Sequence, residues 1–348
     1  MKMKKHSRCA LAVLACAASL TTASAQPDSA KEPAVAVTPD NFIRAETDRY
    51  FGNIASYAFG KLRHYRDFVP LDKVAVVRIN RDTLYSVGVF DLDAGPVTVT
   101  LPDAGKRYIS LVAYNEDHYA SPAIYKPGSY TFTRDQLGTR YAMFGIRVLF
   151  DPTDADDRKR VHALQDAIST RQDGNGRFEV PAWDPASLKR MREALFELGK
   201  TVPDSRGMFG TREQVKPVRH LIGSAIAWGG NQEKDALYLN VTPSRNDGAT
   251  IYRMHVKDVP VDGFWSVSVY DENGFFKPNP YEAYALNDLT ARRSADGSVD
   301  IQFGGCDGKI ANCLPTMPGW NYMVRLYRAR AEILDGSWTF PQAQPVAR

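Results

Sequence analysis

The sequence lacks the short motifs that identify many enzymes. It contains no G-x-S-x-G nucleophile elbow, no H-E-x-x-H zinc helix, no Walker loop and no G-x-G-x-x-G dinucleotide fingerprint. The five histidines after residue 25 all lie more than five positions apart, so their spacing indicates no metal site. We therefore predict neither a metal nor a cofactor, and any active site has to be assembled by the fold.

Cysteine is scarce: of the four cysteines, Cys9 and Cys16 lie near the start, and only Cys306 and Cys313 lie further on. Two cysteines so close in the sequence usually form a local disulfide when the protein matures in an oxidising compartment. The alternative is a metal pair, which would need a nearby histidine that the sequence does not provide. We predict a disulfide between Cys306 and Cys313.

The first 25 residues have the pattern of a secretory signal peptide. Four basic residues precede an apolar run over 10–20, and Ala23-Ser24-Ala25 forms an A-x-A cleavage site before Gln26. The apolar run is too short to anchor a mature protein across a bilayer. We predict a periplasmic or secreted protein, cleaved near Ala25-Gln26 and without a transmembrane segment in the mature chain. A lipoprotein anchored through Cys16 is the alternative.

The excess of basic charge also belongs to this leader. The chain has 44 Lys and Arg against 40 Asp and Glu, a net charge of +4, and the leader carries four basic residues and no acidic ones. Without the leader the chain is formally neutral. A neutral chain gives no electrostatic reason to expect nucleic acid as a partner.

Hydrophobic periodicity divides the rest of the chain into β-rich ends and a helical middle. Helical spacing predicts an amphipathic helix over 39–65, and segments of period two then follow one another from residue 73 to 150. The alternation returns between 237 and 328. The predicted divisions are a signal peptide over 1–25, a flexible start over 26–37, an N-terminal domain over 38–150, a helical connector over 151–232 and a C-terminal domain over 233–348. We predict the α+β class, mainly β, with two antiparallel β-sandwiches, the second of jelly-roll type.

One polar connection between two predicted strands, 80–85, carries candidate binding residues. Arg81 presents a planar fork of donors that could hold an anionic or hydroxylated ligand, with Tyr85 close to it in the sequence. Asp82 is a candidate for ligand binding or acid–base catalysis. The alternative is structural, because such residues also hold a tight connection by pairing and by Asx-type hydrogen bonds.

His118 and Glu282 are the other candidates for proton transfer. His118 follows a predicted strand and could act as a general base. Asp117 is poorly placed to orient it, since neighbours on an extended segment face opposite ways. Glu282 lies in a turn and would serve as acid or base only if a cleft buried it; a solvated carboxylate is the alternative.

Aromatic and basic residues on predicted strands are further candidates for ligand binding. Tyr114, Trp265 and Trp320 could line a pocket, although aromatic residues at sheet positions more often belong to a core. Arg325 alternates with the apolar residues of its strand, so it faces away from them. It could reach a junction between the domains or simply water.

Several of these segments resemble a known family. The run 80–86, followed by Asp91-Leu92 and Gly95-Pro96-Val97, is similar to the DUF1254 domain, and the segments 264–266, 279–280 and 334–338 resemble the DUF1214 domain. The resemblance covers about 42–150 and 236–345. It implies an immunoglobulin-like sandwich in the N-terminal domain and a jelly-roll-like one in the C-terminal domain. Because the family has no assigned function, the resemblance assigns no catalytic residue.

Two functions stay open at this point. The first is an exported cell-envelope protein that binds a small molecule, a carbohydrate or a lipid, or has a role in assembly; it predicts an apolar or aromatic patch without a buried acid–base pair. The second is a periplasmic enzyme, such as a hydrolase, with a site where the two sandwiches meet. Homo-oligomers are compatible with both, since the edges of sandwiches need covering.

Overall fold

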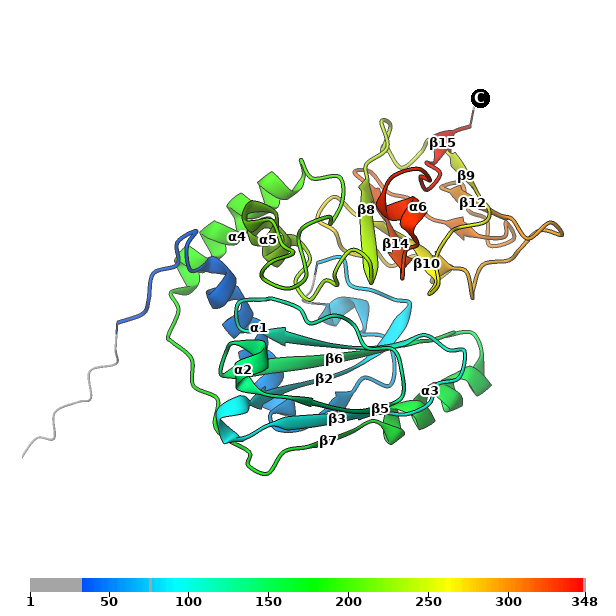
Figure 1. The fold of residues 1–348 in the computed structure, drawn as a ribbon. Helices are drawn as coiled ribbons and strands as arrows, with labels where there is room; N and C mark the ends of the chain where they lie inside the picture. The colour runs from blue at the N-terminus through cyan, green and yellow to red at the C-terminus, as the bar shows by residue number, and fades with distance from the viewer. Residues whose placement is uncertain (1–32, 75–76, 347–348) are drawn as a thin grey trace, which may run out of the picture. The chain divides into compact units, whose positions relative to one another are not determined.

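The computed structural model describes residues 33–74 and 77–346, and this part of the chain is mainly β, with six α-helices (Figure 1). Residues from Ala34 onward cluster as one compact unit, so the domain boundaries proposed within it stay predictions. The predicted signal peptide and Cys16 lie outside the described residues. None of the described helices is both long and apolar enough to cross a membrane.

The first half is built on an antiparallel sheet of four strands. In order across the sheet, the strands are β1 (Arg63–His64), β2 (Thr83–Asp91), β6 (Tyr141–Leu149) and β4 (Ile109–Asn115). One face packs on a three-stranded sheet of β5 (Gly128–Phe132), β3 (Val97–Leu101) and β7 (Ser169–Arg171). Helix α1 (Phe42–Ala58) covers part of the other face. Both faces are covered, which explains why nearly every residue of β2 and β6 is buried.

The second half contains two further sheets of four strands. One has the order β11 (Ala285–Asn287), β10 (Trp265–Tyr270), β14 (Asn321–Tyr327), β8 (Ala236–Val241); the other has the order β13 (Cys313–Leu314), β12 (Val299–Phe303), β9 (Tyr252–Val256), β15 (Gln344–Pro345). All pairs are antiparallel except β12 with β13. An apolar core that includes Val267, Met254 and Trp320 lies between these two sheets. The opposite face of β14 carries Met323, Arg325 and Tyr327, which point toward the site described below.

Helices occupy the middle of the chain, as predicted: they are α3 (Ala155–Ala167), α4 (Pro185–Gly199) and α5 (Pro217–Ile226). The helical segments elsewhere are α2 (Arg134–Leu137), α6 (Ala331–Leu334) and the 3₁₀ turns η1 (Leu71–Lys73) and η2 (Leu92–Ala94). The side chain of Asp184 caps α4 by accepting the N–H of Ser187 at 2.8 Å.

Two expected elements differ from the structure. The helix expected over 39–65 is the shorter α1, because Gly60 adopts a positive φ of 64° and turns the chain before β1. A strand is expected from about residue 73, but the described residues between 73 and 82 form none. The next strand after β1 is β2, which begins at Thr83. Instead, the backbone N–H of Arg78 donates to Gly274 O at 2.9 Å, which ties this segment to the second half.

The predicted disulfide is confirmed: Cys306 and Cys313 are bonded. The bond closes a loop of seven positions, and on the chain-entropy model a loop of this size adds about 2 kcal/mol to the free energy of unfolding. We expect a Cys306→Ser/Cys313→Ser variant to lose this amount in urea unfolding. A reductant should destabilise the wild type equally and leave the variant unchanged. Equal stability of the variant and the oxidised wild type would contradict this contribution.

Candidate functional site

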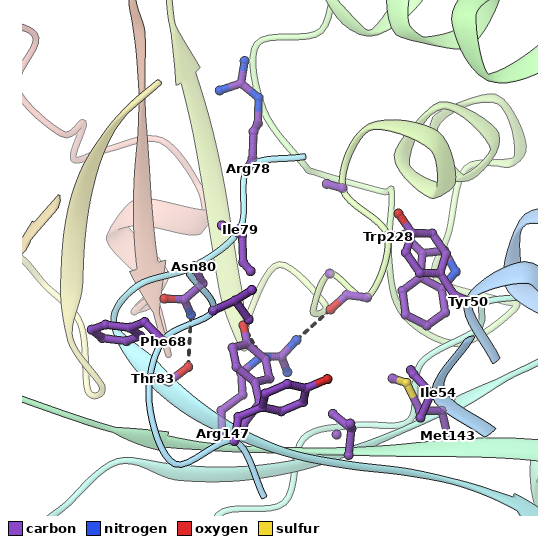
Figure 2. A pocket seen from close by; sticks show the side chains of 18 of the residues that line it. Tyr50, Ile54, Phe68, Arg78, Ile79, Asn80, Thr83, Met143, Arg147 and Trp228 are labelled. Atoms are coloured by element: carbon purple, nitrogen blue, oxygen red, sulfur yellow. Dashed lines mark hydrogen bonds between the residues drawn. The ribbon is translucent and has the colours of Figure 1, made fainter. Parts of the chain in front are cut away.

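A cavity of about 850 Å³ lies between the two halves of the described chain (Figure 2). Its walls are the face of β2 and β6 that points away from the three-stranded sheet, helix α1, the segments around Phe68 and Ile79, the loop 227–230 and one face of β8 and β14. The second half therefore completes the cavity that the first half begins.

Arg147 on β6 is the central polar residue of this cavity. Strand pairing places it directly opposite Tyr85 on β2 and Ser110 on β4. The residues two and four positions before it on the same face, Gly145 and Met143, line the cavity too. Alternation along β6 therefore directs this one guanidinium into the cavity, while its neighbours Ile146 and Val148 enter the core between the N-terminal sheets.

The guanidinium of Arg147 is held by neutral groups alone. Its Nη1 donates to Asn231 Oδ1 at 2.8 Å, and its Nη2 donates to Gly229 O at 2.7 Å and to Tyr114 Oη at 3.2 Å. The residue is 6% exposed, and no carboxylate of the described residues lies within 4.0 Å of it. Arginine keeps its charge in proteins. Arg147 is therefore a buried cation that lacks a counter-ion.

Tyrosine hydroxyls surround this cation. Tyr85, Tyr114, Tyr238 and Tyr327 all line the cavity. Burial raises the pKa of Tyr114, Tyr238 and Tyr327, so each keeps its proton. Tyr238 Oη accepts the N–H of Asn231 at 3.3 Å, and Tyr327 Oη accepts from Asn80 Nδ2 at 3.0 Å. Neither hydroxyl finds an acceptor for its own proton among the described residues, so both can donate to a ligand.

An aromatic pair forms another part of the wall. Figure 2 shows the rings of Tyr50 and Trp228 stacked on each other. Their centroids lie 4.3 Å apart and their planes are 16° apart. Trp228 Nε1 donates to Thr47 Oγ1 at 3.2 Å, which fixes the indole against α1. A flat apolar surface of this kind suits an aromatic or apolar ligand body.

His118 supports the site from behind the cavity wall. Ser224 Oγ donates to His220 O at 2.9 Å and therefore accepts from His118 Nδ1 at 2.8 Å. His118 Nε2 accepts the N–H of Gly229 at 2.8 Å. Burial, together with the charge of His220, lowers the pKa of His118 well below its usual value. Both ring nitrogens are occupied, so the imidazole positions Gly229 and has no free nitrogen to act as a base.

Only some of the predicted site residues lie at the cavity. Tyr85, Tyr114 and Arg325 line it, whereas Arg81, Asp82 and Glu282 do not. Arg81 instead lies over Phe68 and Tyr284, 4.7 and 5.1 Å from the ring centres.

Asp82, Glu282 and the two tryptophans lie in other environments. Asp82 is fully buried and accepts hydrogen bonds from Ser266 Oγ at 2.6 Å and Asn287 Nδ2 at 3.1 Å. Burial raises its pKa. Glu282 is exposed on a turn. Trp265 on β10 and Trp320, which directly precedes β14, belong to the core between the C-terminal sheets. Their predicted roles in binding or catalysis therefore gain no support from the cavity.

Sequence reasoning missed Arg147, Trp228 and Asn231. Arg147 is the one charged residue in the apolar strand YAMFGIRVL, and this isolated charge was the signal that could have identified it. Trp228 and Asn231 follow helix α5 in a glycine-containing loop, and nothing in the sequence near them indicates which strand they meet.

Comparisons with known proteins identify two domains. The family model described as protein of unknown function DUF1254 matches residues 59–172, and the one described as protein of unknown function DUF1214 matches residues 238–331. No curated protein matches the chain.

Two solved structures have a similar fold. The crystal structure of the VPA0106 protein from Vibrio parahaemolyticus is 20% identical, covers 88% of this chain and 98% of its own, and has a TM-score of 0.66. An uncharacterized protein from Burkholderia cenocepacia is 12% identical, with coverages of 88% and 86% and a TM-score of 0.50. At these identities the likeness shows the fold alone.

Proposed function

The chain belongs to the family that joins a DUF1254 domain to a DUF1214 domain, and we propose that it binds a small organic anion in the cavity around Arg147. The observation that carries the proposal is the buried guanidinium of Arg147 without a carboxylate partner. Burying an ion without a counter-ion costs several kcal/mol, and a bound anion would offset this cost. The hydroxyls of Tyr238 and Tyr327 would add donors to the same anion.

The rest of the lining indicates the charge and the body of this ligand. Among the described residues, seven Lys and Arg side chains line the cavity against a single carboxylate, that of Asp67, which pairs with Arg158 at 2.7 Å. Two of the seven, Arg49 and Arg66, pair with carboxylates outside the lining, and five do not. Such a lining attracts anions. The Tyr50–Trp228 pair favours a flat apolar body. A carbohydrate without an acidic group would leave Arg147 without a counter-ion, and a fatty acid would make little use of the stacked rings.

Binding is better supported than hydrolysis. Besides tyrosines, the cavity-lining groups that can transfer protons are His64, Asp67 and the exposed Lys73. His64 Nδ1 lies 2.7 Å from Ser86 Oγ, and burial lowers the pKa of the imidazole. No hydrogen bond of the described residues joins His64 to Asp67, so they do not form the oriented acid–base pair that a hydrolase needs. The periplasmic enzyme therefore remains the second candidate.

Export and the finer fold belong to the same proposal. The disulfide and the leader-like start support a protein that works outside the cytosol. N-terminal sequencing of the secreted or periplasmic protein should begin at Gln26, and a cytosolic protein that begins at Met1 would contradict export.

The paired sheets of each half support an immunoglobulin-like first sandwich and a jelly-roll-like second one.

A fluorescent aromatic anion tests the proposed function. We expect anilinonaphthalene sulfonate to bind with enhanced fluorescence and Arg147→Met to weaken its binding at least about tenfold, because the variant removes the charge that the sulfonate pairs with. Arg147→Lys, which keeps the charge, should bind better than Arg147→Met. The control is Arg160→Met, which removes an exposed arginine of α3 that pairs with Asp154. Equal binding by Arg147→Met and the wild type, both folded by circular dichroism, would overturn the proposal.

A further inference from the structure

Two more arginines line the same cavity, and they come from opposite halves of the chain. Arg325 on β14 is 2% exposed. Its Nη1 donates to Ser268 Oγ at 2.9 Å, and its Nη2 donates to Tyr270 Oη at 2.6 Å and to Arg78 O at 2.8 Å. Arg325 therefore holds the backbone of Arg78 in place from the second half.

Arg78 has unused hydrogen-bonding capacity. Its Nη1 donates to Asn321 Oδ1 at 2.8 Å, and its other guanidinium N–H groups find no acceptor among the described residues. The backbone has a φ of 55°, a conformation that costs energy in a residue other than glycine. The surrounding hydrogen bonds hold this conformation of a residue that lines the cavity, and Figure 2 shows its side chain extending away from Arg147.

The two guanidiniums repel each other. Both lie near the ring of Tyr270, at 5.6 Å for Arg78 and 5.9 Å for Arg325. Burial, together with the charge of Arg325, lowers the pKa of Arg78. No carboxylate of residues 33–74 and 77–346 lies within 4.0 Å of either side chain. The charge of Asp82 acts on Arg325, and that of Asp271, which pairs with Lys277, acts on Arg78, but neither carboxylate is bonded to these guanidiniums. The pair is thus a second concentration of positive charge without a hydrogen-bonded counter-ion among the described residues.

This arginine pair and Arg147 lie on different walls of the cavity. Arg325 is paired across the strands with Tyr238, and Tyr238 Oη accepts the N–H of Asn231. Asn231 Oδ1 in turn accepts from Arg147 Nη1. The uncharged side chain of Tyr238 and the uncharged loop that carries Asn231 therefore separate the two positive regions. The other cavity-lining cations without a carboxylate partner, Arg63 and Lys73, are exposed, so water already solvates them.

We propose that the ligand of this cavity carries two anionic groups, one bound by Arg147 and the other by Arg78 with Arg325. The inference rests on the proposed function, since it concerns the same cavity. A single anion would neutralise one region and leave the other without a hydrogen-bonded counter-ion. An apolar or aromatic body that joins two acidic groups satisfies both regions and the aromatic wall.

Two compounds that differ by one charge test this inference. Terephthalate and its monomethyl ester share an aromatic body and a length, but the ester has one carboxylate fewer. We expect terephthalate to displace bound anilinonaphthalene sulfonate from the wild type at a concentration at least about tenfold lower than the ester. Arg78→Gln should abolish this preference and leave the affinity for the ester unchanged. Arg160→Gln, the matched control at an exposed position outside the cavity, should retain it.

The outcomes separate the inference from the proposal on which it rests. Equal displacement by the two compounds, or displacement by neither, would overturn the second anionic group while anilinonaphthalene sulfonate still binds. A preference that survives in Arg78→Gln, folded by circular dichroism, would overturn the assignment to Arg78. Failure of anilinonaphthalene sulfonate to bind the wild type would overturn the proposed function itself.

Discussion

Replacing His118 with alanine is expected to lower the free energy of unfolding by about 3–4 kcal/mol, because it leaves a void and removes two hydrogen bonds. The imidazole is fully buried, and the ring centres of Phe209, His220 and Trp228 lie 5.8, 5.6 and 5.2 Å from it. Gly229 also loses the acceptor of its N–H. Since Gly229 O accepts from Arg147, binding of anilinonaphthalene sulfonate should weaken as well. Urea unfolding measures the first effect and a fluorescence titration the second.

The control for this variant is a histidine on the protein surface. His255 is exposed, and its Nδ1 lies 2.7 Å from Asp300 Oδ1 on the surface. We expect His255→Ala to change the free energy of unfolding by less than about 0.5 kcal/mol. Wild-type stability of His118→Ala would contradict the structural role of His118 and would favour the catalytic role again.

A large pH effect on stability is expected at Asp48. This carboxyl is 2% exposed; its Oδ2 accepts from Trp183 Nε1 at 2.9 Å, and its Oδ1 has no partner. Burial raises its pKa to about 7, and the charge of Glu116 adds to the shift. The folded state therefore holds the proton more tightly than the unfolded state, whose carboxyl has a pKa of about 3.9. Between these two values the stability of the wild type falls as pH rises.

Asp48→Asn removes this titration. The stability of the variant relative to the wild type should therefore increase by about 2–3 kcal/mol between about pH 5 and about pH 8. Urea unfolding of both proteins at the two pH values measures the difference, in which the titrations that the proteins share cancel. A constant difference would show that Asp48 does not titrate in this range.

A second carboxylate, that of Asp296, provides a control, because its pKa is shifted in the opposite direction to the pKa of Asp48. Hydrogen bonds from Ser298 and Lys257 lower the pKa of the exposed Asp296. A depressed folded pKa adds stability above the unfolded pKa, and this stability is lost as pH falls. Asp296→Asn should therefore be no more stable than the wild type at either pH. If Asp296→Asn were also more stable than the wild type at high pH, the stability gained by Asp48→Asn would not result from the burial of Asp48.

The features that depend on local sequence could be predicted. The α+β class, the helical middle and the Cys306–Cys313 disulfide follow from periodicity and from proximity in the chain, and the structure contains all three. The family could also be named from its segments. Tyr85, Tyr114 and Arg325 were selected as polar or aromatic groups near strand ends or on a strand face, and they line the cavity, although their role in binding stays a prediction.

The features that depend on long-range pairing could not be predicted. Arg147 meets Gly229 and Asn231, more than eighty positions away, only because β6 lies under the loop after α5. Strand register decides such meetings, and a sequence does not state which strands pair. For Trp265 and Trp320 the sequence left a pocket wall and a core as alternatives, and they lie in the core, since the faces that become core depend on the second sheet packed against them.

The most direct test of an anion site at Arg147 is a crystal structure of the protein soaked with 4-bromobenzoate, with the bromine located by its anomalous scattering. We predict the carboxylate within hydrogen-bond distance of the Arg147 guanidinium and the bromine among the aromatic side chains of the cavity. A cavity in which Arg147 contacts only water, in crystals that bind the compound elsewhere, would contradict the site.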